Sequence, residues 1–245
     1  QGRPNTQETA SRPARAARRR WASTAAARGH GRCEVICFSS HHTGSFAELE
    51  APHARLVVEA WRDRTADLLA RPGIVHVFCF ENRGEEIGVT LTHPHGQIYG
   101  YPYLPPRAAL MLAEASAHAE RTGGNLFVDI FAHEGADGSR IVVRTGLFTA
   151  FVPFAARWPV EVHIYPNRFV HNLVDLTDVE LDDFARIYLD VLGRFDRMYP
   201  APLPYIAALH QYADTAEQRS TLEELAAGVY AYTAQGDPNV GAVVG

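Results

Sequence analysis

Two histidines separated by a single proline stand in the stretch His93-Pro94-His95-Gly96-Gln97, and this spacing is hard to explain as packing. Proline fixes its own φ and biases the preceding residue toward an extended backbone. In an extended chain, residues i and i+2 point to the same side, so we expect both imidazoles on one face. Gly96 would let a ligand approach the backbone closely.

These side chains suit two kinds of chemistry near neutral pH. Two neutral imidazoles can share a metal ion, or one can act as a nucleophile while the other is held elsewhere. The carboxamide of Gln97 can donate to one oxygen while it accepts from another group. The alternative interpretation is a polar turn with two partly exposed histidines and no chemistry.

The composition limits the functions that these histidines could serve. The 245 residues are 47% hydrophobic and 21% charged, with a net charge of −5, which is typical of a globular chain of one or two domains. The basic excess of a nucleic-acid-binding protein is missing. No apolar run approaches the ~20 residues needed to cross a membrane. All 23 basic residues are arginine, which excludes a catalytic lysine. We expect no nucleic-acid partner and no membrane association.

The three cysteines are Cys33, Cys37 and Cys79. An odd and sparse set does not make a disulfide framework and is typical of a reducing compartment, so we expect the protein in the cytoplasm. Cys33 and Cys37 would share one face of a strand. We interpret this pair as small core residues rather than zinc ligands, because the spacing suits zinc poorly.

Both ends of the chain differ in composition from its middle. Residues 1–32 hold eight arginines against one acid and show no hydrophobic period, so we predict a disordered or foreign Arg/Ala-rich leader. Residues 213–245 are predicted to be a foreign or irregular tail. Between them we expect a first half at 33–124, which carries the histidine pair, and a partial second half at 125–212.

Hydrophobic periodicity predicts the elements that must position the histidines. In the first half we expect strands at 33–38, 74–80 and 97–103 and helices at 52–70 and 107–121. In the second half we expect a hairpin of 126–131 with 141–143, strands near 147–153 and 160–166, and a helix that a capping box opens at 177–180 and that runs to about 198. Strands grouped with intervening helices indicate an α+β fold with largely antiparallel sheets.

Several separated motifs agree in order and spacing. The histidine pair follows Glu81-Asn82-Arg83-Gly84 and, further upstream, the segment 33–39; Asp137-Gly138-Ser139-Arg140 and the segment 152–159 come later. Together they resemble galactose-1-phosphate uridylyltransferase, a branch of the histidine-triad superfamily. The resemblance covers roughly residues 30–212. It implies two related α+β halves, the second incomplete, in a chain truncated at both ends.

The resemblance implies a UDP-glucose–hexose-1-phosphate uridylyltransferase of galactose metabolism, which works by ping-pong through a uridylyl-histidine. His95 would be the nucleophile, because a neutral imidazole attacks phosphorus near pH 7 and leaves readily from a phosphoramidate. Its other ring nitrogen needs an acceptor to fix the tautomer, and we infer the backbone carbonyl of His93. Gln97 would donate to the phosphoryl oxygens.

The resemblance also implies substrate contacts and a metal. Asn82 and Thr90 fall where the family places nucleotide-contacting side chains, and Phe80 falls where an aromatic ring lines the uridine pocket. His42 and His93 match two zinc ligands of the family, but the family's Cys-x-x-Cys pair is absent from the N-terminal segment. Two imidazoles leave half of zinc's usual four-ligand shell empty, so the sequence leaves zinc open.

Three functions stay open at this point. The first is transfer between a UDP-hexose and a hexose 1-phosphate, for which the family implies a homodimer. The second is a histidine-triad nucleotide hydrolase, in which water resolves the same intermediate. The third is an inactive remnant that keeps only the fold. The Glu81-to-Gly84 motif and Gln97 favour transfer, because simple triad hydrolases usually show a longer alternating histidine run.

Overall fold

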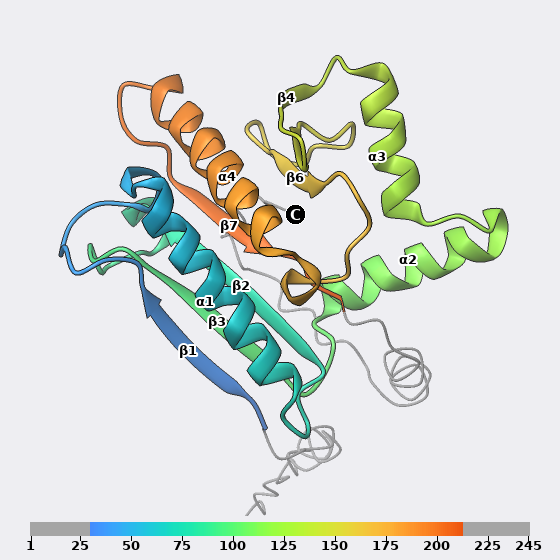
Figure 1. Cartoon of the computed structure of the whole chain (residues 1–245), viewed down its shortest axis with the longest axis horizontal. Coiled ribbons are helices and arrows are strands. Elements are labelled where there is room, and N and C mark those ends of the chain that lie inside the picture. Colours follow the sequence, from blue (N-terminus) through green and yellow to red (C-terminus); the bar gives the residue numbers. More distant parts are fainter. Residues whose placement is uncertain (1–29, 213–245) are drawn as a thin grey trace, which may run out of the picture.

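The computed structural model describes residues 30–212, which form two antiparallel sheets flanked by helices (Figure 1). The strands are β1 Arg32–Cys37, β2 His76–Arg83, β3 His95–Tyr101, β4 Ile141–Arg144, β5 Phe148–Phe151, β6 His163–Pro166 and β7 Tyr205–Leu209. The α-helices are α1 Ala51–Leu69, α2 Pro106–Thr122, α3 Leu126–Asp137 and α4 Asp178–Met198. The first sheet has the order β1-β3-β2-β7 and the second β4-β5-β6. The expected α+β class with antiparallel sheets is confirmed.

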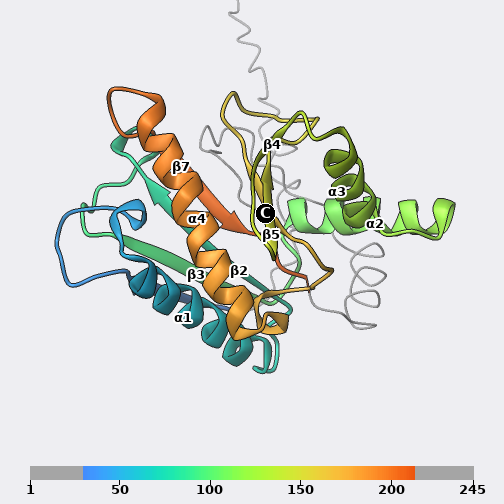
Figure 2. The ribbon, with the colours of Figure 1, turned by 45° about the horizontal axis from the view of Figure 1, so that its top comes forward.

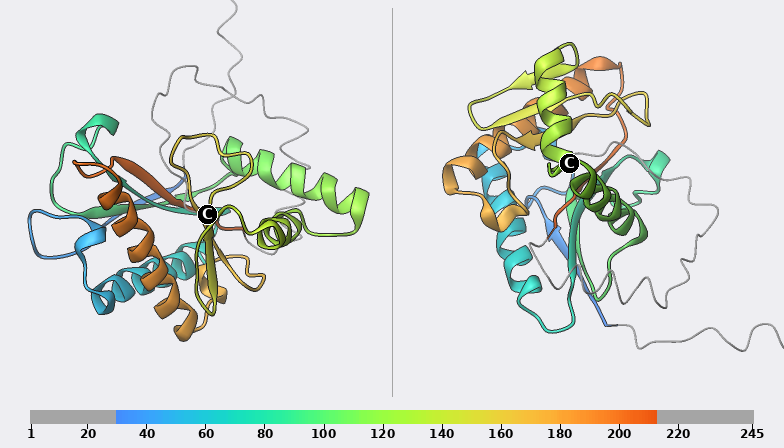
Figure 3. Two further views of the ribbon diagram at one scale, coloured as in Figure 1. Left: turned by 90° about the horizontal axis from the view of Figure 1, so that it is seen from above. Right: turned by 90° about the vertical axis from the view of Figure 1, so that its right-hand side faces the viewer.

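Helices α1 and α4 lie side by side on one face of the first sheet, and the turned views keep both on that side (Figures 2 and 3). The strands alternate accordingly. Val77, Cys79 and Ile98 point toward the helices and are buried. On edge strand β1, by contrast, Val35 keeps 64% of its surface exposed. The first sheet therefore has one covered face and one open face.

Aromatic rings fill the space between the sheet and the two helices. Phe46 stacks on Trp61 of α1 at a centroid distance of 5.7 Å and contacts Tyr188 of α4 at 4.8 Å. Phe38, directly after β1, packs edge-on against Phe46 at 5.2 Å. All four rings are almost fully buried. Aromatic pairs in such tilted or edge-on geometry stabilise a core beyond the area that they bury.

The segment 126–131, which the sequence predicts as a strand, begins helix α3 instead. The side chain of Asn125 accepts hydrogen bonds from the backbone N–H groups of Phe127 and Val128 and so caps the helix. Gly138, with a φ of 69°, ends it in the left-handed conformation. The β-branched and aromatic composition is a weak signal that these two caps override. Strand β4 pairs with β5 rather than with this segment.

The other predicted elements are present within a few residues of their expected bounds. One strand has a partner that periodicity does not predict. Strand β7, from the segment expected as the second half, pairs with β2 from Arg83↔Tyr205 to Cys79↔Leu209. It therefore completes the sheet that carries the histidine motif, and the boundary between the two predicted halves stays a prediction.

The interpretation of Cys33 and Cys37 as core residues is wrong. Both are exposed on edge strand β1, and only Cys79 is buried; all three are free thiols. The spacing correctly places Cys33 and Cys37 on one face of a strand, but that face is the open one. Which face of an edge strand is covered depends on the helices, and the strand's own sequence does not show it.

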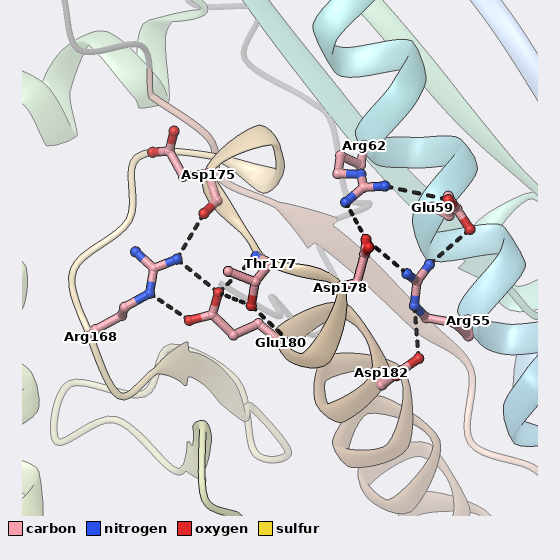
Figure 4. Close-up of polar contacts among 9 residues, drawn as sticks. All are labelled: Arg55, Glu59, Arg62, Arg168, Asp175, Thr177, Asp178, Glu180 and Asp182. Atoms are coloured by element: carbon pink, nitrogen blue, oxygen red, sulfur yellow. Dashed lines mark hydrogen bonds and ion pairs between the residues drawn. The ribbon is translucent and has the colours of Figure 1, made fainter.

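Helix α4 begins at a capping box beside an ion pair between the buried Glu180 and the half-exposed Arg168 (Figure 4). The hydroxyl of Thr177 accepts from the backbone N–H of Glu180, and the Glu180 carboxylate accepts from the backbone N–H of Thr177 at 2.8 Å. Arg168 donates to both Glu180 oxygens. This hydrogen bond from Arg168, above all, lowers the pKa of Glu180 to about 2.

Ion pairs also connect α4 to α1 across their exposed side (Figure 4). Arg55 lies 2.9 Å from Asp182, and Arg62 lies 2.9 Å from Asp178. Partly exposed pairs of this kind contribute little individually, on the order of 0–1 kcal/mol. Their main effect is to fix which turns of the two helices face each other.

The predictions for residues 1–29 and 213–245 lie outside the described residues. Within residues 30–212, none of the helices is long and apolar enough to cross a membrane.

The capping box predicts a measurable loss of stability on substitution. Thr177→Ala removes the N-cap acceptor, so we expect the free energy of unfolding to fall by about 1 kcal/mol. Urea denaturation followed by circular dichroism measures this. Ser116→Ala, at an exposed position inside α2, is the control and should change stability little. Equal stabilities for the two variants would contradict the capping role.

Candidate active site

Strand β3 places the histidine motif at the centre of the first sheet, between β1 and β2. The register pairs His95 with Cys37 of β1, Gly96 with Glu81 of β2, and Gln97 with Phe80 of β2. Exposure alternates along β3, with Gly96 and Ile98 buried toward the helices. His95, Gln97 and Tyr99 therefore project from the open face of the sheet.

The His95 ring is oriented by the backbone of its own motif. Its Nδ1 lies 2.8 Å from the carbonyl oxygen of His93, the contact inferred from the sequence. A carbonyl oxygen can only accept, so Nδ1 carries a proton, and in the neutral ring it is Nε2 that keeps a free electron pair. The loop is held in turn by the backbone N–H of Phe38, which donates to the carbonyl of Pro94 at 2.8 Å. A neutral imidazole with Nε2 unprotonated is a nucleophile ready for attack on an electrophilic centre.

Gly96 serves packing on the covered face rather than ligand approach on the open one. A Cβ at this position would lie 2.8 Å from Cζ of Phe38 and 3.2 Å from the carbonyl oxygen of Phe80. The expectation that Gly96 lets a ligand approach is therefore wrong, because alternation turns it away from His95. Its missing side chain instead lets the Phe38 ring pack closely against the strand that bears His95.

The structure brings two of the predicted substrate-binding residues, Phe80 and Gln97, together beside His95. Phe80 is the direct neighbour of Gln97 across the β2–β3 ladder. Asn82, two residues further along β2, lies on the same face by alternation, and its Oδ1 is buried without a hydrogen-bond partner among the described residues. Thr90 is exposed in the loop before the motif, and no contact in the described structure links it to His95.

His42 and His93 are also brought together. Their rings meet edge-on at a centroid distance of 5.5 Å, and the buried Nδ1 of His93 has no hydrogen-bond partner among the described residues. Within residues 30–212, however, no three His, Cys, Asp or Glu side chains gather as a metal site would require. Residues 1–29 contain neither cysteine nor histidine. The donors of residues 30–212 therefore do not fit a four-ligand zinc site.

A buried carboxyl supports the motif from the covered face. Glu81, the ladder partner of Gly96, accepts hydrogen bonds from Tyr188 of α4 at 2.7 Å and Tyr205 of β7 at 2.5 Å. Arg83 stacks over the Tyr205 ring at 4.6 Å. It also donates to the carbonyl of Leu203 at 2.7 Å. This cluster joins β2, β7 and α4 directly behind the histidine motif.

Two of the residues that shape the site are missing from the predictions made on sequence alone. The sequence marks Glu81 only as part of a motif, because its tyrosine partners lie more than one hundred residues away in sequence. The hydroxyl of Tyr99 donates to Oε1 of Gln97 at 2.7 Å. This second contact could have been found, because residues i and i+2 of a strand share a face.

Comparison with known proteins identifies the family of this chain. The N-terminal domain family of galactose-1-phosphate uridyl transferase matches residues 4–105, and the C-terminal domain family matches residues 112–230. The chain belongs to the galactose-1-phosphate uridylyltransferase family. It is 52% identical over 184 residues to a galactose-1-phosphate uridylyltransferase of Streptomyces lividans and 36% identical over 181 residues to one of Thermotoga maritima.

Each of these matches covers 74% of this chain but 52% and 56% of the relatives, so the chain spans about half the length of the curated relatives it matches. Among solved structures, a uridylyltransferase superposes with a TM-score of 0.71 at 33% identity, covering 74% of this chain and 58% of that one. An ADP-glucose phosphorylase from Arabidopsis thaliana, at 22% identity and a TM-score of 0.69, covers 77% and 60% and shares the fold.

The buried Glu81 predicts an unusual pH dependence of stability. Burial raises its pKa to about 7, although the hydrogen bonds from Tyr205 and Tyr188 oppose this shift. A carboxyl with a higher pKa in the folded state binds its proton more tightly there, so its contribution to the free energy of unfolding falls as pH rises from about 4.5 to about 7. Glu81→Gln removes this dependence and keeps an acceptor for both hydroxyls.

Urea unfolding of both proteins at several values between pH 4.5 and 8 measures the difference. We expect the stability of Glu81→Gln relative to the wild type to rise across this range by up to about 3 kcal/mol. Glu86→Gln, at an exposed position near the same strand end, is the control and should run parallel to the wild type. Parallel curves for Glu81→Gln would show that the carboxyl is not held in its protonated form.

Proposed function

We propose that this chain transfers a uridylyl group between a UDP-hexose and a hexose 1-phosphate through a covalent intermediate on His95. The observation that carries the proposal is the hydrogen bond from His95 Nδ1 to the carbonyl of His93, which leaves Nε2 free on the open face. The named activities of the relatives at 52% and 36% identity support it.

In the first half-reaction, Nε2 of His95 attacks the α-phosphorus of UDP-glucose. The bond from this phosphorus to the bridging oxygen breaks, and glucose 1-phosphate leaves with the electron pair. In the second, a phosphate oxygen of galactose 1-phosphate attacks the same phosphorus, and the electrons of the P–N bond return to Nε2. The carbonyl of His93 stabilises the positive charge that the ring carries while it is uridylylated.

The neighbouring side chains have complementary roles in this proposal. The Nε2 group of Gln97 would donate to the phosphoryl oxygens as their charge redistributes. The partnerless Oδ1 of Asn82 would accept a hydrogen bond from the nucleotide, and Phe80 would offer its ring to the base. Thr90 would reach the nucleotide from its exposed loop before the motif.

The family also suggests the surroundings of this chain. We propose a homodimer, as for the family, and a location in the cytoplasm. The second proposal is supported by free thiols at all three cysteines, two of them exposed.

Among the described residues, zinc would have only His42 and His93 to hold it, two imidazoles that meet edge-on, and it supplies no step of the proposed reaction. Because two ligands leave half of a tetrahedral shell open, we expect well below one zinc per chain after dialysis against a mild chelator. Elemental analysis by mass spectrometry measures the content, with His42→Ala and His93→Ala as comparisons. One tightly retained zinc per chain in the wild type would show that further ligands complete the site.

The covalent intermediate itself is the decisive test of the proposed function. Incubation of the full chain with UDP-glucose should add the mass of one uridylyl group, detected by intact-mass spectrometry. His95→Asn should show no gain, because the asparagine side chain has no ring nitrogen to attack phosphorus. His53→Asn, at an exposed position on α1, should behave as the wild type.

The absence of an adduct in protein with a native circular dichroism spectrum would overturn the proposal. Steady release of UMP without an added sugar phosphate would instead identify a hydrolase that uses the same intermediate.

A further inference from the structure

The side chain of Gln97 is held by one polar contact. Tyr99, two residues further along the same face of β3, donates from its hydroxyl to Gln97 Oε1 at 2.7 Å. Across the ladder, Gln97 is flanked by Val35 of β1 and Phe80 of β2, which are both apolar. Among the described residues, Tyr99 is therefore the only side-chain hydrogen-bond partner of Gln97.

The Tyr99 hydroxyl is itself placed by neighbouring rings. The Tyr99 ring meets Phe80 edge-on at a centroid distance of 5.1 Å and Tyr101 at 5.9 Å. Edge-on pairs of this kind have a preferred geometry, so they limit rotation of the tyrosine ring. Packing of the Tyr99 ring thus positions its hydroxyl independently of the hydrogen bond to Gln97.

The contact engages the oxygen end of the Gln97 amide. The oxygen and nitrogen ends of a glutamine carboxamide have nearly the same shape, and rotation about the last side-chain bond exchanges them with little steric cost. With Oε1 engaged by Tyr99, the NH₂ group turns away from Tyr99. His95 lies on that other side, two residues before Gln97 on the same face.

We propose that Tyr99 is a positioning residue that fixes the Gln97 amide with its N–H donors toward the phosphoryl group at His95. This inference rests on the proposed function, because the phosphoryl group belongs to the nucleotide substrate. Phosphoryl oxygens are anionic and need donors, whereas an amide carbonyl turned toward them would repel the charge that they carry. The hydrogen bond at Oε1 also polarises the amide and makes its N–H groups stronger donors.

Single-turnover formation of the uridylyl adduct tests this role. Tyr99→Phe keeps the ring but loses the hydroxyl, so we expect the maximal rate to fall about tenfold, the usual effect of one hydrogen bond. The half-saturating UDP-glucose concentration should change less than about twofold, since the contact acts on the reacting group. Tyr101→Phe is the matched control. Its ring lies on the same strand face, and its hydroxyl makes no hydrogen bond to the described residues.

A double-variant cycle separates positioning from general damage. If Tyr99 acts through Gln97, then Tyr99→Phe should cost little further rate in a Gln97→Ala background. Full, independent losses in the double variant would overturn the proposal. So would a Tyr99→Phe rate within twofold of the wild type.

A second readout does not need activity. In nuclear magnetic resonance spectra, the side-chain amide signals of Gln97, assigned by their loss in Gln97→Ala, should shift in Tyr99→Phe and stay in place in Tyr101→Phe. Unshifted signals in Tyr99→Phe would overturn the contact itself. If the wild type forms no adduct but the Gln97 amide signals still shift in Tyr99→Phe, the proposed function is refuted and the Tyr99–Gln97 contact is supported.

Discussion

The carboxyl of Glu81 is buried where β2, β7 and α4 meet, and it is compatible with the fold only because two tyrosine hydroxyls donate to it. A buried carboxyl without partners would cost several kcal/mol, so the position of each partner is constrained by the others. β7 must stay paired with β2 for Tyr205 to reach Glu81, and α4 must lie across both strands for Tyr188 to do so. This one interaction therefore ties the covered face of the first sheet into a single unit.

The packing of the covered face also positions the residues on the open face. Gly96, which pairs with Glu81 across the ladder, admits the Phe38 ring on one side, while His95 and Gln97 project on the other. Strand alternation separates the two tasks residue by residue, because neighbours in sequence face opposite environments. His95 can thus stand on a strand whose backbone is packed against aromatic rings and still project from the open face. Rigid support of this kind suits the covalent role proposed for His95.

Local signals in the sequence predict much of this arrangement. The proline between two histidines, the capping box of α4 and the apolar stripe of α1 each act within a few residues, and the structure places the corresponding elements as expected. Short-range competition explains the failure at α3, where the Asn125 cap and Gly138 override a composition that favours strands. The exposure of Cys37 depends on which strand lies at the edge, and the partners of Glu81 depend on pairing across most of the chain. Neither the exposure of Cys37 nor the partners of Glu81 can be predicted from a single segment of the sequence.

The distance in sequence between Glu81 and its partners affects how the protein can be made. Tyr205 follows Glu81 by 124 residues, and Tyr188 follows it by 107. During synthesis, one edge of β2 stays unpaired until the ribosome has completed β7, and Glu81 cannot gain its hydrogen bond from Tyr205 before then. Contacts so far apart in the chain slow folding, and an open edge is a template for association with other chains. A nascent chain of this protein therefore exposes one unpaired edge of β2 until its last described strand emerges.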